Sequence, residues 1–100
     1  MNDDLPALHD NVEERRFEMK IDHDVAYLEY RRREKVIHLM HTEVPSAMRG
    51  RGMGKRLAHA VLDKVRDEGL TVVPNCPFVK DFLRKNPEYH SLVQVPRDPI

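Results

Sequence analysis

Apolar residues alternate with polar ones in two stretches near the beginning of the chain. A period of two is typical of β-strands with one buried face. The apolar positions are Phe17, Met19 and Ile21 in the first stretch, and Ala26, Leu28 and Tyr30 in the second. The intervening segment 22–24 (Asp-His-Asp) is typical of a turn. We therefore predict two neighbouring antiparallel strands.

A third stretch, residues 36–44, is almost continuously apolar. Such runs are typical of central strands that are covered on both faces. The charged segment 31–35 (Arg-Arg-Arg-Glu-Lys) precedes it and predicts a solvated hairpin end. Three strands with connections this short predict an antiparallel meander.

The apolar period changes to that of a helix after residue 52. The apolar positions of segment 53–68 form one stripe, as in a helix packed on a sheet: Met53, Leu57, Ala58, Val61, Leu62 and Val65. Gly69 is a typical residue just past a helix end. Segment 70–73 (Leu-Thr-Val-Val) then predicts a short buried strand. Together with strand 36–44, these elements predict a βαβ unit.

The last part of the chain predicts a second helix. Pro77 suits a first helical turn, and Asn86-Pro87 ends the helix. Its inward positions are Val79, Phe82 and Leu83. Residues 92–95 predict a final edge strand. Residues 1–14 have no periodic apolar pattern, so we expect an N-terminal tail, one domain over 15–95 and a C-terminal tail at 96–100.

Composition narrows the class of protein. The chain has 100 residues, 40% of them apolar, which suits one domain with a modest core. Its 17 basic residues equal its 17 acidic ones, which argues against a dedicated nucleic-acid binder. No apolar run is long enough for a membrane span. A single cysteine and a polar, acidic N-terminus favour a cytoplasmic protein, which we expect to be a monomer or weak dimer.

Three of the four glycines alternate within one short segment, at Gly50, Gly52 and Gly54. Arg49 and Arg51 interleave with them, and the predicted helix opens immediately afterwards. Glycine lets a backbone approach a ligand closely. Free amide groups at a helix N-terminus, beside fixed positive charge, suit phosphates. The segment therefore predicts a site for a phosphate-bearing cofactor.

Two familiar phosphate-binding motifs do not fit this glycine segment. A nucleotide P-loop has four residues between its glycines and ends in Lys followed by Ser or Thr. Here three residues separate Gly50 from Gly54, and Arg56 takes the place of the hydroxyl residue. The dinucleotide fingerprint fails at its third glycine, where Lys55 stands. The remaining alternative is a plain strand-to-helix turn.

The pattern Arg49-x-x-Gly52-x-Gly54 resembles the pyrophosphate-binding loop of the GCN5-related N-acetyltransferase superfamily. Segments 41–44 (His-Thr-Glu-Val), 75–79 (Asn-Cys-Pro-Phe-Val) and 87–89 (Pro-Glu-Tyr) add to a resemblance that covers residues 17–93. Together they resemble its small stand-alone subfamily. This implies an α/β fold with a mixed, mainly antiparallel sheet and two main helices. Strands 36–44 and 70–73 would splay apart to admit coenzyme A.

The resemblance also implies the activity and its cosubstrate. The chain would transfer the acetyl group of acetyl-coenzyme A to an unidentified amine, without a metal. Backbone amides near a bulge before the loop, at Val44 or just ahead of it, would hold the thioester carbonyl. The implied coenzyme-binding positions are Val44, Arg49, Gly50, Arg51, Gly52, Met53, Gly54, Lys55, Cys76 and Lys80, the last near the 3′-phosphate.

His41 is the candidate general base, because a neutral imidazole accepts protons near neutral pH. Strand periodicity predicts that it shares a face with Ile37, Leu39 and Glu43. Glu43 would orient His41 or act as the base itself. The alternative is a hydrogen-bonded structural histidine. His38 falls on the opposite face by the same periodicity, which disfavours a zinc site with His41 and Cys76.

Cys76 directly precedes Pro77 and thus lies near the start of the second helix, where the helix dipole favours thiolates. Three interpretations stay open. Cys76 protonates the departing thiolate, carries the acetyl group transiently, or is a small buried residue. Tyr89 is another candidate acid, although packing is the simpler interpretation of its position beyond Pro87.

The chain is shorter than full-length members of the superfamily. It lacks the helices that normally follow the first strand and help form the acceptor site. A second hypothesis is therefore a binding or sensor module that holds acyl-coenzyme A with little or no turnover. A third is a small structural domain without coenzyme.

Overall fold

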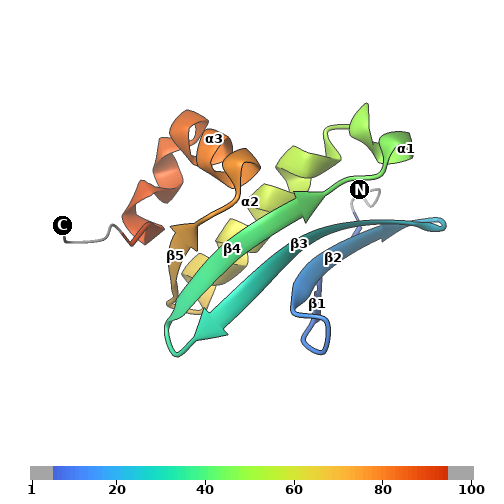
Figure 1. Ribbon diagram of the computed structural model, residues 1–100. Coiled ribbons are helices and arrows are strands. Elements are labelled where there is room, and N and C mark those ends of the chain that lie inside the picture. Colours follow the sequence, from blue (N-terminus) through green and yellow to red (C-terminus); the bar gives the residue numbers. More distant parts are fainter. Residues whose placement is uncertain (1–5, 95–100) are drawn as a thin grey trace.

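A five-stranded sheet forms one layer of the computed structural model, which describes residues 6–94. Its strands follow the chain order: β1 (His9–Asn11), β2 (Arg16–Ile21), β3 (Asp24–Arg33), β4 (Val36–Glu43) and β5 (Thr71–Pro74). β1 to β4 are antiparallel, and β5 runs parallel to β4. The predicted mixed, mainly antiparallel sheet is confirmed (Figure 1).

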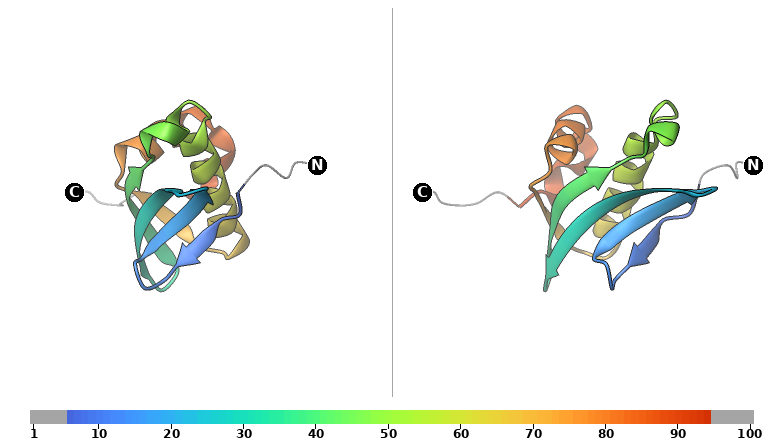
Figure 2. Two further views of the ribbon diagram at one scale, coloured as in Figure 1. Left: turned by 90° about the vertical axis from the view of Figure 1, so that its right-hand side faces the viewer. Right: turned by 45° about the vertical axis from the view of Figure 1, so that its right-hand side comes forward.

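Helices form the second layer, on one side of the sheet (Figure 2). They are the short α1 (Ser46–Arg49), α2 (Met53–Asp67), α3 (Pro77–Lys85) and the 3-10 helix η1 (Pro87–Leu92). The predicted apolar stripe of α2 is buried, as are the three predicted inward residues of α3. The βαβ unit of β4, α2 and β5 is therefore present. No helix within residues 6–94 is both long and apolar enough to span a membrane.

The segment before β2 differs from the prediction. Within the expected tail, His9–Asn11 form the edge strand β1, paired with β2. The Tyr30 hydroxyl on β3 donates a hydrogen bond to Asp10 at 2.6 Å, which ties β1 to the sheet. Backbone pairing and this polar contact stabilise β1 without an apolar alternation. The expected 1–14 tail is thus wrong for residues 9–11; residues 1–5 lie outside the described part.

The expected edge strand at 92–95 is also wrong for the residues described. Leu92 closes η1, and Val93 forms a single isolated bridge with Val72 of β5. Gln94 adds one backbone hydrogen bond to Val72. Residue 95 and the expected tail at 96–100 lie outside the described part. Because the 3-10 helix extends to Leu92, only Val93 and Gln94 follow it within the described residues.

A β-bulge interrupts β4 beside the centre of the sheet. Glu29 of β3 is paired with His41, whereas the next residue, Tyr30, is paired with Leu39. Met40 is therefore the extra residue. A bulge shifts the alternation of side chains by one position. Up to Leu39 the odd-numbered residues of β4 face the helices, and beyond the bulge Thr42 does.

The bulge corrects two predictions about histidines. His41 does not share a face with Ile37 and Leu39, because Met40 and His41 both lie on the open side of the sheet. His38 lies on this side too, rather than opposite His41. The expected two-sided cover of strand 36–44 is also wrong. Leu39 is 0% exposed beneath the helices, whereas Met40 on the open face is 40% exposed.

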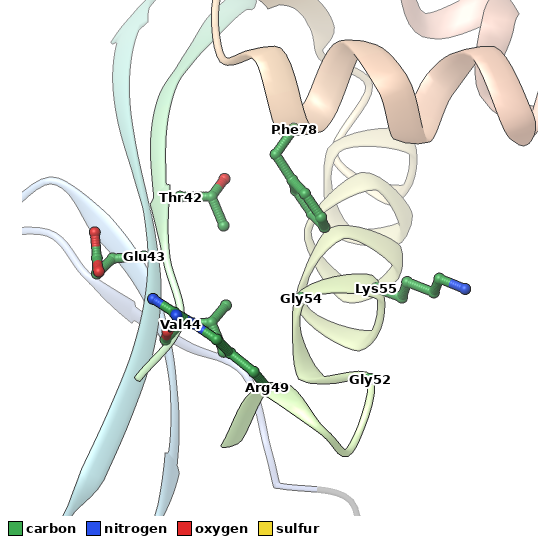
Figure 3. A pocket seen from close by; sticks show the side chains of 8 residues that line it. All are labelled: Thr42, Glu43, Val44, Arg49, Gly52, Gly54, Lys55 and Phe78. Atoms are coloured by element: carbon green, nitrogen blue, oxygen red, sulfur yellow. Dashed lines mark hydrogen bonds between the residues drawn. The ribbon is translucent and has the colours of Figure 1, made fainter. Parts of the chain in front are cut away.

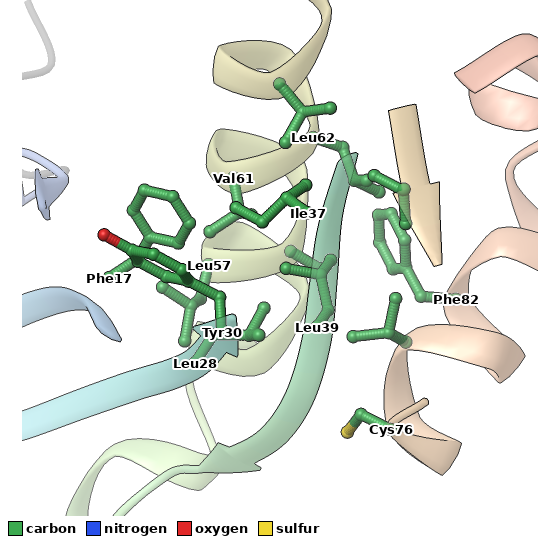
Figure 4. Packing of buried hydrophobic residues seen from close by; sticks show 14 of the residues in the cluster. Phe17, Leu28, Tyr30, Ile37, Leu39, Leu57, Val61, Leu62, Cys76 and Phe82 are labelled. Atoms are coloured by element: carbon green, nitrogen blue, oxygen red, sulfur yellow. The ribbon is translucent and has the colours of Figure 1, made fainter. Parts of the chain in front are cut away.

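The core lies between the sheet and α2, with α3 closing one end (Figure 4). Its central side chains come from four different elements. They are Leu28 of β3, Ile37 and Leu39 of β4, Leu57, Val61 and Leu62 of α2, and Val79 of α3. β4 thus anchors the core through the same strand that carries the bulge.

Neighbouring residues Leu39 and Met40 provide a matched test of the bulge. Leu39→Ala removes a fully buried side chain, so we expect the free energy of unfolding to fall by about 2–5 kcal/mol. Met40→Ala removes an exposed side chain, so the expected change is below about 0.5 kcal/mol. Urea unfolding of both variants measures the difference. Similar losses for the two variants would contradict the assigned register.

Candidate functional site

β4 and β5 pair along half of β4 and then diverge. Pairing runs from Val36 with Thr71 to Leu39 with Pro74. The Leu39 carbonyl then accepts hydrogen bonds from two successive amides, those of Asn75 at 2.9 Å and Cys76 at 3.0 Å. Beyond this point β4 continues, while the segment that follows β5 turns into α3. The predicted splay is therefore present, and we call the point of divergence at Leu39 the fork.

A cavity of about 440 Å³ extends between the free end of β4 and the start of α2 (Figure 3). Its walls come from the end of β4, the glycine segment and the first turn of α3. The lining residues are Thr42, Glu43, Val44, Arg49, Gly52, Gly54, Lys55 and Phe78. The structure thus brings five of the predicted coenzyme-binding residues together around one cavity. Its volume suits a small-molecule ligand.

Gly52 sets the direction in which α2 starts. It has φ +69° and is the N-cap of the helix. The first intrahelical bond runs from the Arg56 amide to the Gly52 carbonyl, at 3.1 Å. The amides of Met53, Gly54 and Lys55 therefore have no acceptor one turn back in the helix. These three amides form the positive end of α2 beside the cavity.

Arg49 adds fixed positive charge on the opposite wall. Its Nε donates a hydrogen bond to the Val44 carbonyl at 2.9 Å. This contact holds the guanidinium against the free end of β4, across the cavity from α2 (Figure 3). The remaining N–H groups of Arg49 provide donors for an anion, whereas the Lys55 side chain extends from α2 away from Arg49 (Figure 3).

Phe78 is a cavity residue that the sequence analysis did not single out. A Cβ atom at Gly54 would lie 2.9 Å from Cζ of Phe78, so glycine at this position allows the ring to rest against α2. Phe78 is 39% exposed. It precedes the buried stripe of α3 by one residue. The available signal was therefore an aromatic residue outside that stripe and directly after Pro77.

Besides Cys76, four predicted coenzyme-binding residues do not line this cavity. Arg51 and Met53 line a separate hollow of about 620 Å³ with residues of β2 and its turn. Lys80 is exposed on α3, and a side chain at Gly50 would meet nothing within 4 Å. α1 accounts for Gly50 and Arg51 only, because its closing turn (Arg51 amide to Met48 carbonyl) directs successive loop residues to different sides.

Cys76 lies at the fork, on the cavity side of β4. It is 3% exposed and occupies the N-cap of α3. Its Sγ lies 3.3 Å from Oγ1 of Thr42, and either atom can donate the hydrogen bond. Thr42 was not predicted, because regular alternation without the bulge places it on the opposite face. The thiol and hydroxyl form a partly buried polar pair, of which Thr42 lines the cavity.

His41 and Glu43 lie on the open side of β4. His41 Nε2 is 3.1 Å from Glu43 Oε1, and the side chains are 53% and 46% exposed. The Tyr27 ring, on the neighbouring strand, is 6.4 Å from the His41 ring between centroids. In Figure 3 Glu43 points away from Thr42 and Phe78. The predicted general base His41, with its partner Glu43, and Cys76 therefore lie on opposite sides of one strand.

Tyr89 is buried away from the cavity. Its hydroxyl donates to Asp63 at 2.6 Å and lies 3.0 Å from Nδ1 of His59 on α2. Burial, together with the hydrogen bond and charge of Asp63, raises the pKa of Tyr89 well above its ordinary value. This environment supports the packing interpretation of Tyr89. In the described range 6–94, no group of three or more His, Cys, Asp or Glu side chains forms a potential metal site.

Gly50 and Gly52 provide a matched test of the loop. Gly52→Ala forces a side chain into the left-handed region, so we expect a loss of about 1 kcal/mol in the free energy of unfolding. Gly50 has φ −72° and open space at Cβ, so Gly50→Ala should be neutral or slightly stabilising. Thermal unfolding of both variants gives the comparison. Equal losses would refute the assigned role of Gly52.

Comparison with known proteins gives a consistent result. The family described as GCN5-related N-acetyl-transferase matches residues 16–92. Mouse protein NATD1 is 39% identical over 82 residues, covering 79% of this chain and 74% of its own length. Zebrafish protein NATD1 is 37% identical over 94 residues, covering 91% and 84%.

A solved structure also matches this fold. The NMR solution structure of a GCN5-like protein from Staphylococcus aureus superposes with a TM-score of 0.70 and 26% sequence identity. The match covers 91% of this chain and 90% of that one. The similarity therefore extends over nearly the whole fold of this chain.

Proposed function

This chain belongs to the GCN5-related N-acetyltransferase family, and we propose that it transfers the acetyl group of acetyl-coenzyme A to an amine. The family and the structural neighbour support an acetyltransferase-like function. The observation that carries the finer proposal is the cavity between the end of β4, just beyond the fork, and the start of α2. A phosphate-bearing end fits the positive helix terminus, and a narrow thioester arm fits the gap between the strands.

The start of α2 is the proposed pyrophosphate site. The amides of Met53, Gly54 and Lys55 supply donors, and the helix dipole favours negative charge there. Arg49, held by the Val44 carbonyl, faces them across the cavity. Gly54 supports this assignment, because any side chain here would push against Phe78 and narrow the cavity.

The fork is the proposed site of the chemistry. The amine nitrogen attacks the thioester carbonyl carbon, and the carbon–sulfur bond breaks. We propose that His41, hydrogen-bonded to Glu43, removes the proton from the amine on the open side of β4. The Thr42–Cys76 pair, on the cavity side, supplies a proton to the departing thiolate. Backbone amides at the end of β4 polarise the carbonyl.

A second candidate function is the binding of acyl-coenzyme A without efficient turnover. The open face of β4 supports it, since no helix in residues 6–94 covers His41 and Glu43. An acceptor on this side would therefore contact only the open face of the sheet. Micromolar binding of acetyl-coenzyme A, with no release of free thiol across an amine panel, would favour this candidate.

Gly54→Glu tests the coenzyme site directly. It places a carboxylate beside the pyrophosphate donors and a side chain against the Phe78 ring, and both changes oppose coenzyme binding. Loss of a charge-assisted contact of about 2 kcal/mol corresponds to about 30-fold weaker binding. Calorimetric titration with acetyl-coenzyme A and with free coenzyme A measures it. Ser91→Glu, on exposed η1, adds the same charge as a control and should bind normally. Equal affinities for the two variants would refute the loop assignment.

His41→Gln tests the proposed base. We expect kcat to fall by about 100-fold, because general-base catalysis contributes on that order, while the Kd for acetyl-coenzyme A stays within twofold. The assay follows release of the coenzyme thiol. His23→Gln, an exposed histidine in the turn after β2, is the control. Unchanged kcat in His41→Gln would exclude His41 as the base.

A further inference from the structure

The triple-arginine segment does more than end a hairpin. Arg31 is the cross-strand partner of His38, and Arg33 is the partner of Val36. Directly paired residues share a face of the sheet, so Arg31, Arg33 and His38 all lie on the open face. Arg32 alternates to the other face, where it pairs with Glu68 at the end of α2, at 3.4 Å.

The open-face side chains Arg31, Arg33 and His38 border a hollow of about 480 Å³ on the surface, which we call the arginine hollow. Its lining residues are Arg31, Arg32, Arg33, His38, Met40 and Asn75. Within residues 6–94, neither Arg31 nor Arg33 forms an ion pair with a carboxylate. Two guanidinium groups therefore bring unneutralised positive charge to a concave surface. Arginine presents paired donors that match the oxygens of carboxylates and phosphates.

The arginine hollow opens at the fork, on the side opposite the coenzyme cavity. Met40 is the bulged residue of β4, and Asn75 directly follows β5, so together they flank the point of divergence. Thr42 and Cys76 meet behind this point, on the cavity side. A ligand in the hollow thus approaches the thioester position from the face that the coenzyme leaves free.

Negative charge gathers at the opposite end of the same face. His41 follows Met40 directly and lies next to it on the open side. Glu43 contacts His41 at 3.1 Å, and Glu29 is the cross-strand partner of His41. Along β3 and β4, the open face therefore changes from basic at Arg31 and Arg33 to acidic at Glu29 and Glu43. This pattern is complementary to a molecule with an anionic group at one end and an amine at the other.

We propose that the arginine hollow binds the anionic group of the acetyl acceptor, which is a small amine bearing a carboxylate or a phosphate. The inference rests on the proposed acetyl transfer and specifies its substrate class. Arg31 and Arg33 bind the anion, and Met40 provides an apolar floor. The amine then lies beside His41 and Glu43, at the open side of the fork.

The first experiment measures anion binding without any assumption about the acceptor. The full-length, ¹⁵N-labelled chain is titrated with inorganic phosphate and, separately, with acetate. We expect saturable shifts of the Arg31 and Arg33 side-chain Nε–H signals and of the Asn75 amide signal. In the double variant Arg31→Gln/Arg33→Gln, the shift of the Asn75 amide should disappear. Arg84, exposed on α3 and paired with Asp81, is the internal reference. Equal shifts at Arg84, or none at Arg31 and Arg33, would overturn the proposal.

The second experiment measures acetyl transfer to matched pairs of amines. Glucosamine 6-phosphate is compared with glucosamine, and glycine with glycinamide, which separates phosphate from carboxylate recognition. We expect the anionic member of one pair to have a KM at least about tenfold lower, since a charge-assisted contact contributes about 1.5–3 kcal/mol. The double arginine variant should remove this preference and leave the Kd for acetyl-coenzyme A unchanged. Arg84→Gln should keep both.

The outcomes distinguish the inference from the proposed function. Transfer to neutral amines with equal or lower KM would overturn the inference and retain the acetyltransferase. Failure to bind acetyl-coenzyme A would overturn the proposed function, even where Arg31 and Arg33 still bind phosphate. A KM preference that survives in the double variant would also contradict the role of the arginine hollow.

Discussion

The carbonyl of Leu39 is the point on which the rest of the site depends. It accepts hydrogen bonds from the amides of Asn75 and Cys76, and these bonds end the β4–β5 ladder. The Leu39 side chain is fully buried, so the core fixes this carbonyl in place. Because pairing stops here, the last residues of β4 are free of a neighbour on one edge. The same turn starts α3, and it places Phe78 along the cavity and Cys76 beside Thr42.

The bulge at Met40 assigns the side chains next to this point to the two faces of the sheet. Thr42 reaches the cavity, whereas Met40 and His41 reach the open face. Without the extra residue, His41 would point into the core and Thr42 into solvent. One strand thus separates a proposed proton donor on one side from a proposed base on the other. In the proposed reaction, the acceptor and the coenzyme therefore approach the fork from opposite faces of the sheet.

The sequence predicts those elements whose stability comes from apolar periodicity. The stripe of α2 and the alternation in β2 and β3 are examples, and the βαβ unit follows from them. β1 was missed, because backbone pairing and the hydrogen bond from Tyr30 to Asp10 hold it across twenty positions of sequence. The family resemblance implied a bulge before the loop, but its position at Met40 was not predicted, because one additional residue in an apolar strand leaves the composition of that strand unchanged.

For the site, the spacing of Gly52 and Gly54 correctly indicated where the cavity lies, since each has a specific steric reason. Gly52 needs a positive φ, and Gly54 leaves room for Phe78. Sequence spacing does not reveal the direction in which a side chain points. For this reason Arg51 was predicted to join the coenzyme-binding residues, although it lines a different hollow.

The most direct test of the coenzyme assignment is a ¹H–¹⁵N spectrum of the chain with acetyl-coenzyme A. We predict the largest shifts at Val44, Gly54, Lys55 and Cys76. Shifts confined to other surfaces, or none at millimolar ligand, would contradict the account.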